Sequence, residues 1–262
     1  MDTLPGLLLT LTALTGEFPT DLVHRLPGSA SYKEAVVKRL KRERLLRTYY
    51  HDGLRGLRLT ATSKRLLLAD QPALFSDTFI GHTVTNTPKY TVPHRIRLHR
   101  MAEVLVTMYQ AGIPSFPWEK SAVFQPTPLP AGTFASLPAY YSSREVKEIG
   151  PQSSKIRGSR STGVLLSNAG IFIVYNTAAS KIKWEYKAEL RLKALLQIEL
   201  CQQRLAAQFA GSSVNAVVFG QGIEPLEYLM GPGDAGTRNY FVLDGNFEHF
   251  YYLTSDHYGE VM

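Results

Sequence analysis

Basic side chains gather between Ser31 and Arg65, where the sequence holds eleven Lys and Arg residues and three Asp and Glu residues. Eleven minus three leaves eight positive charges, which exceeds the net charge of +7 of the whole chain. Up to Gln110 the chain has 16 basic and 9 acidic residues, and the remainder has 13 of each. Because each neutralised phosphate releases condensed counterions, this localised excess predicts a surface that contacts a polyanion.

Two helices are predicted ahead of this basic segment. Leucines recur at helical spacing from Leu4 to Leu14, and the pattern stops at Thr15-Gly16. Thr20 is expected to cap a second, shorter helix, which ends at Pro27-Gly28. Leu22, Val23 and Leu26 of the second helix are expected to face inward.

A third helix is predicted to carry the largest share of the basic residues. Ser31 and Glu34 have the spacing of a capping box, which would start this helix. Val36, Val37 and Leu40 form its apolar stripe. Its other faces carry Lys33, Lys38, Arg39, Lys41 and Arg42.

The period of the sequence then changes from helix to strand. Residues 47–51 and 54–59 are predicted to form two strands, joined by the tight turn that Asp52-Gly53 favours. Arg58 is expected on the face opposite to the one that the leucines of the second strand share. Thr62 would cap a fourth helix after this hairpin.

Three helices, a basic hairpin and a closing helix resemble a winged helix-turn-helix domain. The resemblance lies in the stretch VKRLKRERLLRTYYHDGLRGLRLTATSKRLLL, from Val37 to Leu68. Many winged-helix regulators share a basic helix ending in "LL", a hairpin with a glycine at its tip, and then "LT" and a helix. The resemblance implies that the third helix enters a major groove of double-stranded DNA, while the wing around Asp52 touches the adjacent backbone or minor groove.

This docking mode divides the expected DNA-binding residues into two groups. Ser31, Tyr32 and Lys33 lie near the start of the third helix and are expected to face base edges. Lys41 and Arg42 further along the helix, with Arg47 and Arg55 on the wing, are expected mainly to contact phosphates, which position the protein without reading sequence. Lys38 and Arg39 complete the expected DNA-binding set.

An alternative is that these charges form the solvated face of a protein-interaction domain, a role that winged helices also serve. A merely soluble face usually mixes both signs of charge. The ratio of eleven basic to three acidic residues therefore favours DNA binding over this alternative.

The charge asymmetry also favours two domains in an α+β chain. Residues 1–70 are predicted to form the winged helix-turn-helix domain. Residues 71–93 are rich in Thr, Pro and Asn and are interpreted as a connector. Residues 94–262 are predicted to form a C-terminal α/β domain, in which residues 94–111 are helical and residues 114–138 are irregular.

Histidine and arginine side chains cluster at the start of the helix predicted for residues 94–111. Such a cluster could bind phosphate, or His94 and His99 could ligate a metal ion. These two histidines are five residues apart and have no acidic or cysteine partner close in sequence. Structural or DNA-backbone roles are therefore expected for them, and no metal or other cofactor.

The C-terminal domain is predicted to have a small sheet with one long helix against it. The runs 163–166 and 171–175 flank a turn and suggest a hairpin. A long amphipathic helix is expected over 184–209, followed by a strand at 214–219. Two further apolar runs, 240–243 and 247–253, suggest a second hairpin.

A hairpin followed by a helix, placed after a winged helix, is similar to the replication-relaxation proteins of plasmids and conjugative elements. Their C-terminal part resembles the restriction-endonuclease-like fold, which needs acidic residues and a lysine to hold Mg²⁺. Here the first strand offers Arg160, Ser161 and Thr162, and the second ends in Tyr175-Asn176, where a carboxylate is needed. We therefore expect a non-catalytic C-terminal domain in a regulator or accessory factor of a mobile element.

Two alternative functions stay open. One is a metal-dependent nuclease, for which Glu185, Lys187 and Glu189 are the candidates. The other is a protein-interaction adaptor, in which the aromatic C-terminus of the chain presents an apolar interface, although the alternation of these residues also fits ordinary sheet core. These aromatic residues are Tyr240, Phe241, Phe247, Phe250, Tyr251, Tyr252 and Tyr258.

Other kinds of site have little support in the sequence. It contains no P-loop motif, and Gly220-Gln221-Gly222 lacks the third glycine of a dinucleotide-binding loop. The single cysteine, Cys201, excludes an intramolecular disulfide and is expected to be a buried thiol. Leu4 to Leu14 lacks the basic flank and cleavage site of a signal peptide, and no apolar run is long enough for a membrane span. A cytoplasmic location, away from the membrane, is expected.

Overall fold

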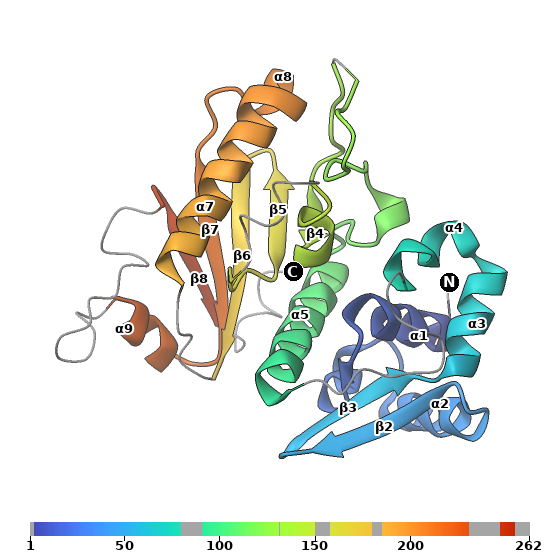
Figure 1. The fold of residues 1–262 in the computed structure, drawn as a ribbon. Coiled ribbons are helices and arrows are strands. Elements are labelled where there is room, and N and C mark those ends of the chain that lie inside the picture. The colour runs from blue at the N-terminus through green and yellow to red at the C-terminus, as the bar shows by residue number, and fades with distance from the viewer. Residues whose placement is uncertain are drawn as a thin grey trace. The chain divides into compact units, whose positions relative to one another are not determined.

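The computed structural model describes residues 3–79, 91–130, 132–149, 158–179, 185–230 and 247–254. The fold is α+β, with helices and two sheets (Figure 1). The chain divides into two compact units, Met1–Val106 and Thr107–Met262. The sequence-based boundary lay before His94, whereas helix α5 (Val92–Gln110) belongs with the first unit as far as Val106.

The first unit begins with alternating helices and short strands. In chain order these are α1 (Leu4–Thr15), β1 (Phe18–Pro19), the 3₁₀ helix η1 (Asp21–Arg25), α2 (Ala30–Arg42), β2 (Leu46–His51), β3 (Leu54–Leu59) and α3 (Ala61–Asp70). The segment interpreted as a connector is mostly helical where it is described, because it forms α4 (Pro72–Phe75), the 3₁₀ helix η2 (Asp77–Phe79) and the start of α5. Residues 80–90 of that segment lie outside the described residues.

The sheet of the first unit has the strand order β1-β3-β2, and both pairings are antiparallel. The predicted β2–β3 hairpin is confirmed, with Tyr50 opposite Arg55 and His51 opposite Leu54. Asp52 and Gly53 form the turn with φ angles of 49° and 75°. Positive φ at both central residues is what a tight hairpin turn requires, and Asp-Gly tolerates it.

The helix caps differ from the sequence prediction. The predicted capping box of Ser31 and Glu34 is wrong, because Ser29 caps α2 and its Oγ accepts a hydrogen bond from the Tyr32 N–H (3.3 Å). Thr60, not Thr62, caps α3 and accepts from the Ser63 N–H (3.2 Å). In both cases an eligible hydroxyl two residues earlier has the extended backbone that an N-cap needs.

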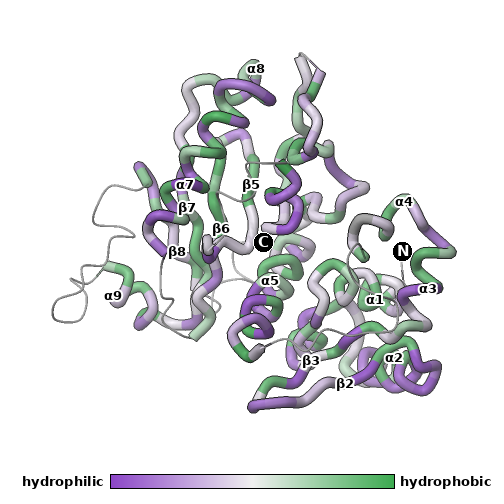
Figure 2. The backbone as a smooth tube through the Cα atoms, in the orientation of Figure 1, coloured by the Kyte–Doolittle hydropathy of each residue, from purple (hydrophilic) through white to green (hydrophobic). Residues whose placement is uncertain are grey.

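Leucines from the helices and the hairpin form the core of the first unit. Leu8 and Leu11 of α1 lie buried together with Phe18 of β1, Leu40 of α2 and Leu57 of β3. Figure 2 shows that the early part of α5 is hydrophilic and its later part hydrophobic, which matches the run of His and Arg residues that opens this helix.

The second unit contains a mixed five-stranded sheet in the order β4-β5-β6-β7-β8. Its strands are β4 (Ala139–Ser142), β5 (Gly163–Ser167), β6 (Gly170–Ala178), β7 (Val214–Gly220) and β8 (Phe250–Thr254). The predicted β5–β6 hairpin and the strand β7 are confirmed, whereas β4 was not predicted. Strand β8 pairs parallel to β7, and the other half of the predicted second hairpin, residues 240–243, lies outside the described residues.

The predicted long helix runs over one face of this sheet (Figure 1). It consists of α7 (Tyr186–Leu196), a π-helical segment (Gln197–Arg204) and α8 (Ala206–Phe209), and its leucines share a buried core with the inward-facing residues of β5, β6 and β7. Cys201 is buried on this helix, as expected. Shorter elements are the 3₁₀ helix η3 (Pro117–Glu119), α6 (Ser143–Val146) and α9 (Glu224–Met230). Apart from η3, the described residues between 114 and 138 are irregular, as predicted.

Candidate nucleic-acid interface

The solvent-facing side of α2 carries a stripe of exposed residues, two of which are basic. Val36 and Leu40 are buried and fix the inward face of the helix. Because a helix turns by about 100° per residue, the opposite side is formed by positions 31, 35, 38 and 42. These exposed residues, Ser31, Ala35, Lys38 and Arg42, are named here the α2 stripe.

Two acidic residues lie beside the cations of α2 but hold them weakly. Lys38 Nζ is 3.7 Å from Glu34 and Arg39 Nε is 3.8 Å from Glu43, and all four side chains are about half or more exposed to solvent. Exposed ion pairs of this kind contribute about 0–1 kcal/mol. Lys38 and Arg39 therefore remain available to an anionic partner, as do the exposed Lys41 and Arg42.

The three residues expected to face base edges have different environments. Tyr32 is 48% exposed, and Ser31 is exposed. The Lys33 ammonium instead donates hydrogen bonds to the carbonyls of His24 (2.6 Å) and Leu26 (3.1 Å), at the end of η1. Lys33 therefore links α2 to the preceding turn. Because its ammonium is engaged in these hydrogen bonds, we assign Lys33 a structural role in place of the predicted base contact.

The β2–β3 hairpin adds exposed cations on both of its faces, because side chains alternate along a strand and Arg47 lies opposite Arg58 whereas Arg55 lies opposite Tyr50. Arg47 and Arg55 are exposed, and the Arg55 guanidinium lies 5.9 Å from the centre of the Tyr50 ring on the neighbouring strand. Tyr50 is 66% exposed on β2, an edge strand of the sheet. Tyr50 was not among the predicted site residues. Its exposed place opposite Arg55 suits contact with a sugar or a phosphate.

Lys64 brings a further cation close to Arg47. It lies in the first turn of α3, with its ammonium 5.8 Å from the centre of the Phe79 ring. Burial lowers the pKa of Lys64, and the positive charge of Arg47 lowers it further. Two cations from different elements therefore repel each other here, and an anion between them would relieve that repulsion.

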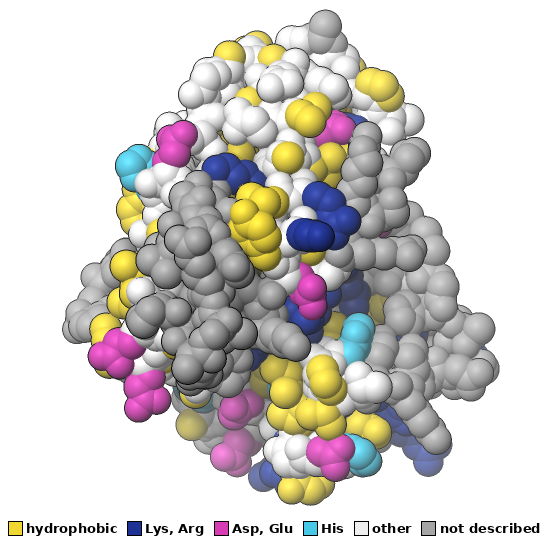
Figure 3. Space-filling view, turned by 60° about the vertical axis from the view of Figure 1, so that its left-hand side comes forward, with side chains coloured by type: hydrophobic (Ala, Val, Ile, Leu, Met, Phe, Trp, Pro, Cys, Tyr) yellow, Lys and Arg dark blue, Asp and Glu magenta, His cyan; other side chains and the backbone are white. Residues whose placement is uncertain are grey.

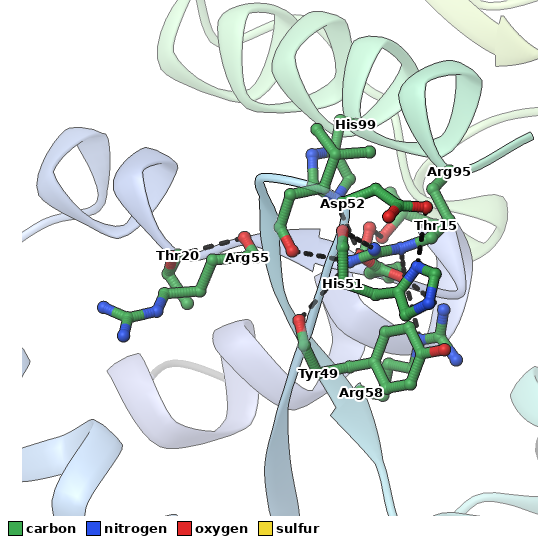
Figure 4. A network of polar contacts seen from close by, with 11 residues as sticks. Thr15, Thr20, Tyr49, His51, Asp52, Arg55, Arg58, Arg95 and His99 are labelled. Atoms are coloured by element: carbon green, nitrogen blue, oxygen red, sulfur yellow. Dashed lines mark hydrogen bonds and ion pairs between the residues drawn. The ribbon is translucent and has the colours of Figure 1, made fainter. Parts of the chain in front are cut away.

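Behind the hairpin lies a buried group of charged residues, Glu17, Arg58, Arg95 and His99, named here the Glu17 cluster (Figure 4). Arg58 contacts Glu17 Oε2 through Nε (2.7 Å) and Nη2 (2.6 Å). Arg95 contacts Glu17 Oε1 through Nη2 (2.6 Å), and His99 Nε2 is 2.8 Å from the same oxygen. The Glu17 and Arg95 side chains are fully buried.

The electrostatics of the cluster keep Glu17 ionised. Burial alone would raise the pKa of Glu17, but hydrogen bonds with His99, Arg95 and Arg58 outweigh it and lower the pKa to about 2. Two guanidinium groups surround this single carboxylate. The cluster thus retains at least one positive charge directly beneath the exposed basic hairpin.

Arg95 also reaches the backbone of the hairpin. Its guanidinium donates to the carbonyls of His51 (2.8 Å), Leu54 (3.1 Å) and Tyr49 (3.3 Å). Its Cζ atom lies 4.7 Å from the centre of the Tyr49 ring, and the Cζ atom of Arg58 lies 3.8 Å from it. The Tyr49 ring therefore contacts both guanidinium groups of the cluster. Through the hydrogen bonds of Arg95, α5 is linked to both strands of the hairpin next to the turn.

The basic start of α5 thus has a structural role, one of the roles expected for it. Arg95 and His99 bind Glu17, whereas His94 is exposed. The metal alternative gains no support, because in the part of the chain that the structure describes no three His, Cys, Asp or Glu side chains gather as a metal site would need. One sequence signal for the cluster exists, namely an acidic residue directly before the buried strand β1.

The nuclease candidates of the second unit are not arranged as an open acidic site. Glu189 is buried, and its Oε1 accepts from the Arg160 N–H (2.6 Å) while its Oε2 accepts from Ser159 Oγ (2.9 Å) and Tyr175 Oη (2.8 Å). Burial raises the pKa of Glu189, against the effect of these hydrogen bonds. Glu185 and Lys187 are exposed, and Glu185 lies 3.8 Å from Arg160.

The C-terminal aromatic residues are divided between core and surface. Phe247 packs against the sheet core with its ring centre 6.4 Å from that of Tyr175, and Phe250 and Tyr252 also pack against the core. Tyr251 is 48% exposed. Tyr240, Phe241 and Tyr258 lie outside the described residues. The described aromatics therefore act largely as sheet core.

Comparison with protein-family models, curated proteins and solved structures finds no match to this chain. Among the helices that the structure describes, none combines the length and the apolar character needed to cross a bilayer. Figure 3 shows one face of the molecule, on which basic and acidic side chains are interspersed with apolar ones. The described residues of that face do not form a field of a single sign.

Proposed function

We propose that the first unit binds double-stranded DNA through the α2 stripe and the β2–β3 hairpin. The observation that carries this proposal is the exposure of Lys38, Arg39, Lys41 and Arg42 on α2 together with Arg47 and Arg55 on the adjoining hairpin. None of these six cations forms a buried ion pair in the described structure. Phosphate groups of DNA are the polyanion that such a surface fits best.

The order of the elements supports a winged helix-turn-helix interpretation. A helix, a short strand, two helices and a hairpin follow one another, and the first strand pairs with the second strand of the hairpin. In this docking mode α2 would enter the major groove and the hairpin would act as the wing. The relationship to replication-relaxation proteins stays a proposal that rests on domain order.

The environments of the side chains refine the division of labour. Ser31 and Lys38 stand on the outer side of α2, and Tyr32 is 48% exposed at the edge of the buried face. We assign base-edge contacts to these three residues. Phosphate contacts are assigned to six partly or fully exposed cations of α2, the hairpin and the start of α3. These are Arg39, Lys41, Arg42, Arg47, Arg55 and Lys64.

For the second unit we propose a non-catalytic role, such as contact with a protein partner or a second copy of the chain. The carboxylate of Glu189 is engaged by three donors inside the unit, which supports a structural function over metal binding. A regulator or accessory factor of a mobile element would combine such a unit with a DNA-binding one.

Fluorescence anisotropy with a short labelled duplex of random sequence tests the proposal. The variant with Lys38→Ala and Arg42→Ala removes two cations one helical turn apart on α2. A matched control, Lys187→Ala with Arg191→Ala, removes two exposed cations at the same spacing on α7. Binding should be tight at low salt, and the α2 variant should lower the log–log salt slope by roughly 0.9 for each phosphate that it no longer neutralises.

The control variant should bind as the unchanged protein does, because the second unit has no net charge excess. Absence of binding at low salt would overturn the proposal. Equal weakening by the two double variants would also overturn it, since that result would reflect net charge alone.

A further inference from the structure

We infer that Arg95 is a positioning residue for DNA binding, which holds the tip of the β2–β3 hairpin so that Arg55 and Tyr50 are placed before DNA arrives. This inference rests on the proposed function of the first unit. Arg95 lies in α5, far from the predicted DNA-contacting residues in sequence, and its side chain is fully buried. It would therefore act on DNA only through the hairpin.

The guanidinium of Arg95 is fixed at both of its ends. On one side Nε and Nη2 hold the two carboxylate oxygens of Glu17 at 2.6 to 3.1 Å. On the other side Nη1 and Nη2 donate to the carbonyls of His51 and Leu54, the residues that flank the turn Asp52-Gly53. Because the guanidinium is planar and rigid, this arrangement fixes the hairpin tip relative to Glu17.

The opposite side of the tip is held by Thr20. Both its backbone N–H and its hydroxyl donate to the carbonyl of Arg55, each at 3.2 Å (Figure 4). Thr20 was predicted to cap a helix, but its side chain makes no capping hydrogen bond and serves the hairpin instead. Two neighbouring carbonyls of β3 are thus held from different elements. Thr20 binds the carbonyl of Arg55, and Arg95 binds the carbonyl of Leu54.

A two-stranded hairpin is marginally stable by itself, and its tip would move if it were held only by strand pairing. The side chain of Arg55 points away from this support into solvent, beside the exposed ring of Tyr50. A phosphate that meets a fixed guanidinium needs less ordering on binding than one that meets a mobile loop. Arg95 would therefore increase affinity without touching DNA.

Arg95→Lys is the informative substitution, because lysine keeps the positive charge but cannot span Glu17 and the hairpin carbonyls together. We expect the variant to bind the random-sequence duplex about three- to tenfold more weakly, as for a side chain that must be ordered on binding. If Arg95→Lys only lowered the stability of the protein, it would not selectively reduce the effect of Arg55→Ala on DNA affinity. A double-mutant cycle measures whether it does so.

In the full chain, Arg55→Ala and Lys38→Ala are each combined with Arg95→Lys. If Arg95 acts through the hairpin, Arg55→Ala should weaken binding much less in the Arg95→Lys background than in the unchanged protein. Lys38→Ala lies on α2 and should weaken binding by the same factor in both backgrounds. Independent, multiplying effects of Arg95→Lys and Arg55→Ala would overturn the inference while leaving DNA binding established.

Absence of binding by the unchanged protein would instead overturn the proposed function, and the inference with it. If Arg95→Lys fails to fold, Thr20→Val takes its place in the same cycle. This substitution removes only the hydroxyl that donates to the Arg55 carbonyl and keeps the shape of the side chain. It should show the same loss of the Arg55→Ala effect, and unreduced effects in this background would contradict the inference.

Discussion

The guanidinium of Arg95 lies 2.6 Å from the carboxylate of Glu17, although 78 residues separate them along the chain. Both side chains are fully buried, and Arg58 and His99 complete the surroundings of the carboxylate. The pair joins the end of the first helix–strand segment to α5 and, through the Arg95 hydrogen bonds, to the hairpin. A buried charged contact therefore links three separate segments of the first unit.

Glu17→Gln should destabilise the first unit strongly. The substitution leaves two buried guanidinium groups without a negative partner, and breaking a buried pair in this way typically costs about 3–5 kcal/mol. Glu34→Gln is the matched control, because Glu34 pairs with Lys38 on the exposed surface and its loss should cost less than about 1 kcal/mol. Urea unfolding, monitored by hydrogen exchange in peptides of the first unit, measures the loss of unfolding free energy for both substitutions. Equal effects of the two substitutions would contradict the assigned role of the cluster.

Acid should unfold the first unit through Glu17. Its pKa is lowered from 4.5 to about 2 in the folded chain, so folding favours the ionised form. The stabilisation is therefore fully present above pH 4.5 and is lost as the pH falls toward about 2, with a total on the order of 3 kcal/mol. The free energy of unfolding of Glu17→Gln should show a correspondingly smaller dependence on pH over this range. Parallel curves for the two proteins would show that Glu17 does not titrate as described.

Gly56→Ala should disturb the same cluster from the opposite side. A Cβ at Gly56 would lie 2.5 Å from Glu17 Cγ, and the carboxylate cannot retreat because Arg58 and Arg95 hold it. Overpacking of this kind costs about 1–3 kcal/mol. Gly53→Ala also falls on the hairpin but meets open space, although its φ of +75° adds backbone strain. Gly56→Ala, unlike Gly53→Ala, should therefore increase hydrogen exchange at the start of α5.

Local turn chemistry made much of the fold predictable. Asp52-Gly53 and the turn between β5 and β6 determine their hairpins with few neighbours involved, and both hairpins were predicted. The caps were misplaced by two residues because Ser29 and Ser31, like Thr60 and Thr62, are equally eligible by type. The choice between them depends on where packing begins the helix.

The pairing of residues in the Glu17 cluster could not be predicted from one sequence, although Glu17 directly before β1 is a local signal for it. Its members come from separate segments of the chain and meet only through the tertiary fold. Arg58 was expected on the outer face of its strand, and that face is covered in the structure, so a residue counted with the basic surface is 2% exposed. The exposed cations of α2 were predictable, because burial of Val36 and Leu40 fixes the helix face.

Lys33→Met should affect stability more than sequence discrimination. The ammonium donates to the His24 and Leu26 carbonyls at the protein surface, so its removal should cost about 0.5–1.5 kcal/mol. Tyr32→Ala, in the same turn and 48% exposed, should instead reduce discrimination between cognate and random duplexes, because a specific base contact is worth about 1–3 kcal/mol. A cognate site selected from random duplexes allows both to be measured. Reversal of the two effects would mean that Lys33 leaves its internal hydrogen bonds when DNA binds.

Glu189→Ala should destabilise the second unit and leave DNA affinity unchanged. The substitution removes the acceptor for the Arg160 N–H, Ser159 Oγ and Tyr175 Oη, and buried donors left unsatisfied cost about 1–3 kcal/mol each. Thermal unfolding and the anisotropy titration measure the two properties separately. Mg²⁺-dependent cleavage of DNA that disappears in this variant would favour the nuclease alternative over the proposed non-catalytic role.

Lys64 should take up protons when DNA binds at alkaline pH. Burial and the charge of Arg47 lower its pKa in the free protein, so part of the Lys64 population is neutral at high pH. A phosphate between Lys64 and Arg47 favours the charged form and should raise this pKa again. Lys64→Arg keeps the positive charge but does not titrate in this range, so it should bind DNA with similar affinity and take up fewer protons. Calorimetric titration in buffers of different ionisation enthalpy measures the number of protons that each protein takes up on binding DNA.

Equal proton uptake by the two proteins would remove Lys64 from the phosphate-binding residues. A smaller uptake in Lys64→Arg would place a phosphate beside Arg47 and Lys64.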